Sequence, residues 1–229
     1  MTPLASRVFM YDGPLLIVVA TVWAYTICVG VMAVRVRRRN GAPAMLVPTD
    51  RLERRLWLIW VPLVVAQNVL PALAVRRRHP LLAVPELTLT DPVFSILRWA
   101  ASFCALLCLL MTVTCWARMG GSWRLGVAPD QRTRLVTGGF YARIRHPIYA
   151  LNALLFLCVA VIVPTLPMIT VAVLHIALII LKARNEERCL LQSHGEEYAE
   201  YCRRTGCLFP RLAPREKLTA ASKEDVPPS

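Results

Sequence analysis

The sequence is short of charged residues, and most of those it has are basic. Only 18% of its 229 residues are charged, and 14 Asp and Glu stand against 27 Lys and Arg. Soluble domains carry about 25% charged residues. With 56% hydrophobic residues and a mean hydropathy of +0.50, this shortage excludes an ordinary soluble globular domain. The composition indicates a protein that crosses a membrane several times.

Paired cysteine motifs are missing as well. The eight cysteines include no Cys-x-x-Cys pair, and five of them lie within apolar runs. In such runs a cysteine behaves as a small hydrophobic residue. A disulfide framework is therefore not expected, and no metal site is predicted.

The net charge of +13 does not predict nucleic-acid binding, because the basic residues form no continuous face or tract. They stand in short runs beside apolar segments, the pattern of membrane proteins that obey the positive-inside rule. The bias of 24 Arg to 3 Lys favours a GC-rich bacterial genome. We therefore expect an integral protein of a bacterial inner membrane.

Five apolar runs predict an all-α membrane protein with about five transmembrane helices. The first run has neither a basic region before it nor a small-residue cleavage site, so it is expected to span the membrane rather than act as a signal peptide. The last run continues without Gly or Pro to residue 193. As a helix it would be about 39 Å long and project beyond the ~30 Å hydrocarbon layer. The predicted spans are 13–34, 56–75, 93–116, 147–163 and 168–193.

The distribution of Lys and Arg orients these spans. With the N-terminus outside, 22 basic residues fall on the inner side and 4 on the outer side. This predicts a cytoplasmic C-terminus. We divide the chain into N-terminal helices and a loop (1–92), a core carrying the last three spans (93–212) and a polar, Pro-ended tail (213–229) that is expected to be disordered. Arg98 is expected to snorkel to the membrane surface, and the loop 76–92 to be irregular.

The last two spans form a hairpin around the turn Pro164-Thr165-Leu166-Pro167. Antiparallel helices folded at its midpoint would place Arg145 opposite Glu186, and His146 opposite Asn185. Helix 147–163 begins with a favoured N-terminal proline, and its free N–H groups attract anions. The hairpin therefore predicts a site at the cytoplasmic surface, with a basic helix start facing an acidic helix end.

This arrangement suits a zwitterionic ligand. Arg145, His146 and the helix start would bind a carboxylate or phosphate, whereas Glu186 and Glu187 would bind an amine, a cation or ribose hydroxyls. A flat ring of the ligand would pack on Tyr141 or Tyr149. S-adenosylmethionine matches this description, and a dinucleotide matches it less well.

The segment LVTGGFYARIRHPIY, followed one hairpin later by NEERCLLQSHGEEYAEYCRRTGCLFP, strongly resembles the isoprenylcysteine carboxyl methyltransferase family. Relatives of that family include phospholipid N-methyltransferases. The likeness covers about residues 116–210. Its elements are LVTxGxY from Leu135, RHPxY from Arg145, the pair Glu186-Glu187, and GxxYxxY from Gly195, ending at Pro210.

The resemblance implies a membrane-embedded, non-Rossmann methyltransferase that uses S-adenosylmethionine, with 93–212 as the methyltransferase core. It assigns the cofactor to three parts of the chain: the loop between the third and fourth predicted spans, the hairpin of the last two spans, and a C-terminal amphipathic helix. Together with Arg145 from the charge argument, the cofactor residues are Leu135, Val136, Tyr141, Arg145, His146, Pro147, Tyr149 and Glu186.

The resemblance also bears on the acceptor. A basic residue before the Glu pair is expected to contact a substrate carboxylate; Arg184 is favoured over Lys182. An amine or thiol acceptor would need a base, His146 or Glu187. The family often has a histidine where this chain has Thr133. The predicted acceptor is lipophilic: an isoprenylcysteine-like carboxylate by resemblance, or an aminophospholipid or small thiol. The other predicted partners are membrane lipids.

Two other functions stay open at this stage. One is an NADPH-dependent membrane reductase of the sterol-reductase type, and the other a non-catalytic protein that binds anionic lipid through its basic loops. Polar residues within the spans, His175 among them, are expected to pack against other helices. The Trp residues near span ends are expected to form interfacial belts. The sequence does not specify an oligomeric state.

Overall fold

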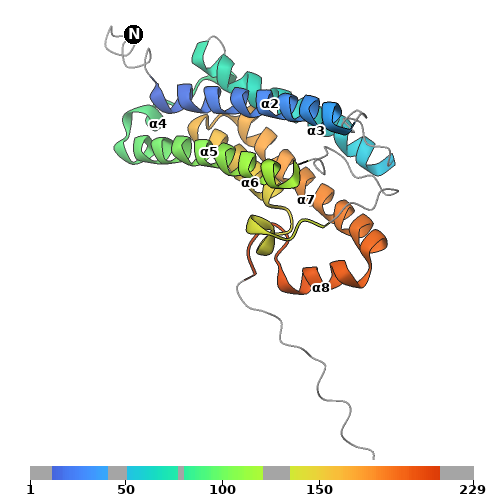
Figure 1. The fold of residues 1–229 in the computed structure, drawn as a ribbon. Coiled ribbons are helices and arrows are strands. Elements are labelled where there is room, and N and C mark those ends of the chain that lie inside the picture. Colours follow the sequence, from blue (N-terminus) through green and yellow to red (C-terminus); the bar gives the residue numbers. More distant parts are fainter. Residues whose placement is uncertain (1–11, 41–50, 77–79, 121–134, 212–229) are drawn as a thin grey trace, which may run out of the picture.

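The computed structural model describes residues 12–40, 51–76, 80–120 and 135–211. Thr133 and the tail 213–229 lie outside these ranges. The regular elements of the described residues are all helices, and the segments that connect them include one isolated β-bridge (Figure 1). Its elements are α2 (Gly13–Asn40), α3 (Arg51–Arg76), η1 (Pro80–Leu82), α4 (Leu87–Thr90), α5 (Pro92–Met119), η3 (Gly139–Ala142), α6 (Pro147–Ile162), α7 (Leu166–His194) and α8 (Glu196–Arg204).

Four of the helices are long and apolar enough to cross a membrane: α2, α3, α5 and α7. The fifth predicted span, α6, has 16 residues and is about 24 Å long, less than the ~30 Å hydrocarbon layer. The all-α membrane architecture is thus confirmed, with one helix shorter than a full span. Both α2 and α3 extend beyond the predicted apolar runs, because their flanking basic residues continue the helices.

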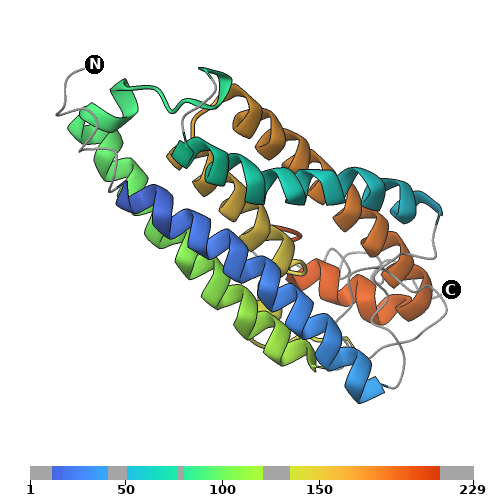
Figure 2. The ribbon, with the colours of Figure 1, turned by 90° about the horizontal axis from the view of Figure 1, so that it is seen from above.

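The helices pack around α6. It lies between α5 and α7, while α2 packs on α5 and α3 packs on α7 (Figure 2). The main hydrophobic core joins α2, α5, α6 and α7 through fully buried side chains such as Val18, Phe156 and Met168. This packing makes α6 the most enclosed helix of the bundle and places its N-terminal end among the other helices.

The outward faces of the long helices are apolar. Ile27 of α2, Ile96 of α5 and Val173 of α7 are each more than 60% exposed. A soluble protein rarely exposes so much large apolar surface. In a bilayer these side chains face lipid, as the composition predicts.

The region before α5 is more ordered than expected, because it includes η1 and α4. The Asp91 carboxylate accepts hydrogen bonds from the backbone N–H groups of Val93 and Phe94 and so caps α5. The prediction that Arg98 snorkels to the surface is wrong. Its side chain is 6% exposed, forms a 2.5 Å ion pair with Asp12 and donates to the Ile162 carbonyl at the end of α6. A counter-ion and an unpaired helix-end carbonyl together hold the guanidinium inside the protein.

The polar residues within the spans face other helices, as predicted. His175 is fully buried, its Nε2 lies 2.6 Å from Asn152 Oδ1, and its ring stacks on Phe156. Asn68 accepts a 3.1 Å hydrogen bond from the Thr26 hydroxyl. These contacts tie α6 to α7 and α2 to α3.

A short amphipathic helix, α8, closes one end of the bundle, as the sequence predicts (Figure 1). Gly195 separates it from α7 with φ +55°, a conformation that glycine adopts without strain. The buried face of α8 carries Tyr198 and Tyr201. The Tyr201 hydroxyl donates a 2.6 Å hydrogen bond to the Tyr141 carbonyl. The helix therefore packs directly on the segment that enters α6.

Candidate active site

The segment before α6 is extended and pairs with the chain after α8. Ile144 and Gly206 form a parallel β-bridge. Arg145 N–H donates to the Gly206 carbonyl at 2.8 Å, and His146 N–H donates to the Cys207 carbonyl at 3.1 Å. Pro147 then starts α6, where its missing N–H costs no helical hydrogen bond. The side chains of 145 and 146 are thus held by backbone pairing on one side and by the helix on the other.

Arg145 joins three parts of this end of the protein. Its Nε donates to Glu187 Oε1 at 2.7 Å, and its Nη1 donates to the carbonyls of Cys202 and Thr205. Burial alone would lower the pKa of Arg145, but the Glu187 carboxylate outweighs it, and the pKa is raised. The guanidinium is permanently charged and is largely used for structure.

The predicted register of the hairpin is wrong by about one residue. Arg145 pairs with Glu187 instead of Glu186, and His146 faces the two glutamates instead of Asn185. The prediction treated residues 145 and 146 as helical, with a rise of 1.5 Å per residue. They are extended, with a rise of about 3.3 Å per residue, so they reach further along α7.

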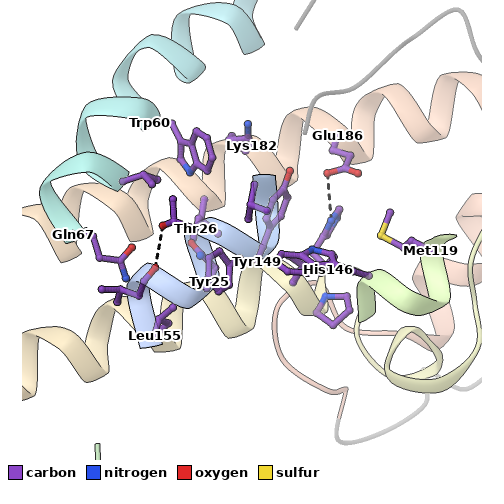
Figure 3. Close-up of a pocket in the computed structure, with 18 of the residues that line it drawn as sticks. Tyr25, Thr26, Trp60, Gln67, Met119, His146, Tyr149, Leu155, Lys182 and Glu186 are labelled. Carbon is purple, nitrogen blue, oxygen red and sulfur yellow. Dashed lines mark hydrogen bonds and ion pairs between the residues drawn. The ribbon is translucent and has the colours of Figure 1, made fainter. Parts of the chain in front are cut away.

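His146 lies between two carboxylates. Its Nδ1 is 3.7 Å from Glu186 Oε2 and its Nε2 is 3.5 Å from Glu187 Oε1. The imidazole is 5% exposed and stacks on Tyr149, with ring centroids 5.5 Å apart. Figure 3 shows Glu186 and His146 side by side at one end of a cavity, with Tyr149 next to them. Nδ1 therefore faces Glu186, which lines the cavity, and Nε2 faces Glu187, which does not.

The cavity extends from this end into the middle of the bundle. Its volume is about 170 Å³, whereas a buried water needs roughly 10–15 Å³, so it can hold an organic molecule. The walls are mostly apolar, and the polar groups stand at separate places along it. Among the lining residues are Tyr25, Thr26, Trp60, Gln67, Met119, Tyr141, Arg145, His146, Pro147, Tyr149, Asn152, Leu155, Lys182 and Glu186.

Most of the predicted site residues line this single cavity: Tyr141, Arg145, His146, Pro147, Tyr149 and Glu186. Glu187 lies beneath them, paired with Arg145 and facing His146. Leu135 and Val136 are half-buried and are not among the lining residues. Their cofactor contact stays a prediction.

The two basic residues proposed for the acceptor differ in position. Arg184 is exposed and does not line the cavity, whereas Lys182 does. The Lys182 ammonium is 5.6 Å from the centre of the Trp60 ring and 3.6 Å from Glu53 Oε1. The side chains of Lys182 and Glu53 are 4% and 3% exposed. This geometry favours Lys182 over Arg184 as the residue that meets an acceptor.

Sequence reasoning missed the contribution of the first two helices. Glu53, Trp60 and Gln67 come from α3, outside any motif, and two of them line the cavity. Trp60 and Trp116 are not simple interfacial residues: both line the cavity, and Trp116 packs on Tyr25. The one available signal was a glutamate next to the apolar run of α3. A charged residue beside a membrane span is usually in contact with water, so its presence is a weak sign of a buried ion pair.

Hydroxyl and thiol groups around the site remain protonated at neutral pH. Burial raises the pKa of Tyr141, and nearby Cys115 and Glu186 add to the effect. Burial also raises the pKa of Tyr201 to about 12. The pKa of Cys207 is raised to about 11 by burial and by the Glu187 carboxylate. These groups act as neutral hydrogen-bonding partners unless a cation displaces a proton.

The fold and the site define a multi-pass helical membrane protein with an internal cavity, which has His146 and Glu186 at its polar end. Residues 100–192 match the model of the isoprenylcysteine carboxyl methyltransferase (ICMT) family. The resemblance inferred from the motifs is therefore confirmed over that segment, which contains most of α5, the residues that precede α6, all of α6 and most of α7.

Two curated relatives are similar to the chain. One is the "Cobalt-zinc-cadmium resistance protein CzcN" of Cupriavidus metallidurans, 33% identical over 133 residues, which are 57% of this chain and 62% of the relative. The other is the "Nickel-cobalt-cadmium resistance protein NccN" of Alcaligenes xylosoxydans xylosoxydans, 31% identical over 110 residues, which are 48% of this chain and 52% of the relative. The matches thus span between half and two thirds of these relatives.

Proposed function

We propose that the protein is a membrane methyltransferase that transfers the methyl group of S-adenosylmethionine to a lipophilic acceptor. The observation that carries the proposal is the position of His146 and Glu186, 3.7 Å apart at the mouth of a cavity that continues between the helices. The match of residues 100–192 to the ICMT family supports the reaction class.

The residues at the mouth fit the charged part of the cofactor. Glu186 is the carboxylate that faces the cavity, and it suits the amine, the sulfonium or the ribose hydroxyls. Its neighbour Glu187 is already paired with Arg145. The start of α6 offers free N–H groups to a carboxylate. Tyr141 brings a buried hydroxyl that has no hydrogen-bond partner within the described chain and is therefore available to a ligand.

The cofactor supplies an activated methyl group on a positively charged sulfur. The protein's part is to hold the acceptor in line with that methyl and to keep water out. A carboxylate acceptor needs no base. A thiol or amine acceptor must lose a proton, and His146, between two carboxylates, is positioned to accept it.

The charges along the cavity bear on the acceptor. Lys182 already has Glu53 as a counter-ion, so an acceptor carboxylate would have to compete with Glu53 for the ammonium. A neutral acceptor such as a thiol or an uncharged amine would leave the pair intact. A carboxylate acceptor would therefore bind Lys182 only after the Lys182–Glu53 pair has opened. Carboxylates should be tested beside aminophospholipids and small thiols.

The acceptor is proposed to enter from the bilayer, between helices, because most of the cavity wall is apolar. From the 22-to-4 bias of basic residues, we infer that the mouth faces the cytoplasm, in a bacterial inner membrane. The two relatives are named for resistance to metal ions. The acceptor is therefore best sought in cells grown with and without such metals.

The test has two parts. Purified protein in detergent should gain thermal stability from S-adenosylhomocysteine but not from NADPH; the reverse result would favour a reductase. Membranes should then be incubated with methyl-labelled S-adenosylmethionine and separated into lipid, thiol and peptide fractions. Label in one fraction that depends on Glu186 identifies the acceptor class. An absence of both ligand stabilisation and label transfer would refute the proposal and favour a lipid-binding role.

A further inference from the structure

Three metal-binding side chains from separate segments meet behind the cavity mouth. His146 precedes α6, Glu187 lies near the end of α7, and Cys207 follows α8. Each offers one donor atom, and the three atoms lie within 4.8 Å of one another. His146 is buried, and the other two are half-buried. The backbone hydrogen bond from His146 N–H to the Cys207 carbonyl holds two of these segments together.

One atom of this group lacks a partner. His146 Nε2 is buried and has no hydrogen bond within the described part of the chain. Its nearest carboxylate oxygen, Glu187 Oε1, is 3.5 Å away, beyond the range of a well-formed hydrogen bond. A buried polar atom without a partner is costly, and it points directly at the acidic and thiol groups of the same cluster. A bound cation would give this nitrogen a partner.

We propose that His146, Glu187 and Cys207 bind a divalent cation of the zinc or cobalt kind. Imidazole nitrogen, carboxylate oxygen and thiolate sulfur together form a donor set that these ions accept. Bond lengths of about 2.0–2.3 Å require the donors to approach by up to about 1 Å from their present spacing. Three protein ligands leave a fourth position open for water or for a group of a bound molecule.

The charges around the cluster balance such an ion. The ion would displace the thiol proton of Cys207, which is released to solvent, so that Glu187 and the Cys207 thiolate each carry one negative charge. Arg145 and Glu186 beside them carry opposite charges that cancel. The dication would therefore sit in a neutral group. Arg145 contacts Glu187 through Oε1 and is held separately by the Cys202 and Thr205 carbonyls. Arg145 bonds only one oxygen of Glu187, so the other oxygen could bind the ion without removing the guanidinium.

The ion would also fix the tautomer of His146, which lines the cavity. His146 would bind it through Nε2, which keeps the proton on Nδ1, the nitrogen facing Glu186 at 3.7 Å. This contact is also longer than a hydrogen bond, and a small approach of Glu186 would complete the carboxylate–histidine–metal arrangement that fixes ring tautomer and orientation in metal sites. With Nε2 on the ion and the proton on Nδ1, His146 has no basic nitrogen left, so the metal-bound protein would not use His146 as the base for a thiol or amine acceptor. The proposal does not depend on the methyltransferase activity and departs from the expectation of no metal site, which rested on the missing Cys-x-x-Cys pair.

The test uses Co²⁺ added to the full-length protein purified in detergent, because cobalt bound to a thiolate gives a characteristic near-ultraviolet absorption. We expect one equivalent of Co²⁺ to bind and to produce this band, and Zn²⁺ to remove it by competition. Cys207→Ser should abolish the band and weaken binding at least tenfold. Cys202→Ser, a half-buried thiol of α8 outside the cluster, should leave both unchanged. Glu186→Gln should weaken binding roughly tenfold through His146.

A second measurement needs no variant and therefore holds even if Cys207→Ser does not fold. Zn²⁺ should protect Cys207, and not Cys202, from alkylation by a maleimide, as read by mass spectrometry of peptides. The proposal is overturned if Co²⁺ gives no thiolate band in the wild-type protein. It is equally overturned if Cys207→Ser binds like wild type, or if Zn²⁺ leaves the alkylation of Cys207 unchanged.

Discussion

Arg145 and Glu187 are joined by a 2.7 Å hydrogen bond from Nε to Oε1, across 42 positions of the chain. The bond links the entry of α6 to the end of α7, and the same guanidinium holds the end of α8 through two carbonyls. Three segments far apart in sequence therefore depend on one side chain. The functional part of the site is built on this contact.

We expect Arg145→Ala to lower the free energy of unfolding by about 2–3 kcal/mol, because a charge-assisted bond is lost and Glu187 is left half-buried without its partner. The matched control is Arg203→Ala. Arg203 pairs with Glu196 and Glu200 but is about half exposed, so solvent screens these pairs and its loss should cost much less than the loss of Arg145. Thermal unfolding in detergent measures both. Equal losses would contradict the structural role of Arg145.

The adjacent glutamates should separate binding from stability. Glu186 faces the cavity, whereas Glu187 pairs with Arg145. We expect Glu186→Gln to weaken S-adenosylhomocysteine binding by about ten- to a hundredfold, the equivalent of one charged hydrogen bond, with little change in stability. Glu187→Gln should mainly lower stability. Calorimetric titration measures the binding, and thermal unfolding measures the stability. The reverse pattern would show that Glu187, and not Glu186, binds the ligand.

The Glu53–Lys182 pair is buried on both sides, so each single substitution takes the opposite charge away from a buried ion. Glu53→Gln and Lys182→Met are each expected to destabilise the protein by about 3–5 kcal/mol, and the double variant to recover most of that loss. A double-mutant cycle by thermal unfolding tests this. Additive losses would mean that the two side chains do not interact. If the acceptor is a carboxylate, Glu53→Gln should also strengthen its binding by freeing the ammonium.

Two tyrosines of α8 offer a matched comparison. The Tyr201 hydroxyl donates to the Tyr141 carbonyl at 2.6 Å, whereas the Tyr198 hydroxyl has no such bond within the described residues. Tyr201→Phe should therefore lower stability by about 1 kcal/mol, and Tyr198→Phe by less than half of that. The difference in melting temperature is the measurement. A larger loss for Tyr198→Phe than for Tyr201→Phe would contradict the role given to the Tyr201–Tyr141 hydrogen bond.

The sequence predicts the helical membrane fold and the meeting of two motifs, because both follow from local patterns. Apolar runs mark spans, and a tight turn forces the flanking helices together. It does not predict the one-residue shift at Arg145, since the β-bridge with Gly206 depends on a segment sixty residues away. The sequence also does not predict that residues of α2 and α3 form part of the cavity wall. Glu53 and Gln67 belong to no motif, and their role follows only from the packing of α3 on α7.

Arg98 illustrates the same limit. A long cationic side chain near a span end is normally expected to reach water. Here Asp12, just before α2, and the Ile162 carbonyl at the end of α6 supply its partners inside the protein. Neither partner is adjacent to Arg98 in sequence, so the burial of the guanidinium is a property of the tertiary structure.

Because α6 is short, the thickness of the surrounding bilayer affects how close the aqueous boundary lies to His146. At about 24 Å, the helix ends several ångströms short of one face of a typical bilayer, which either thins around it or leaves the mouth of the cavity recessed. Lipids with shorter chains would bring the aqueous boundary to His146, whereas longer chains would bury it deeper. The composition of the membrane would thus set how readily the proposed water-soluble cofactor reaches the site, which the proposed lipophilic acceptor enters from the bilayer.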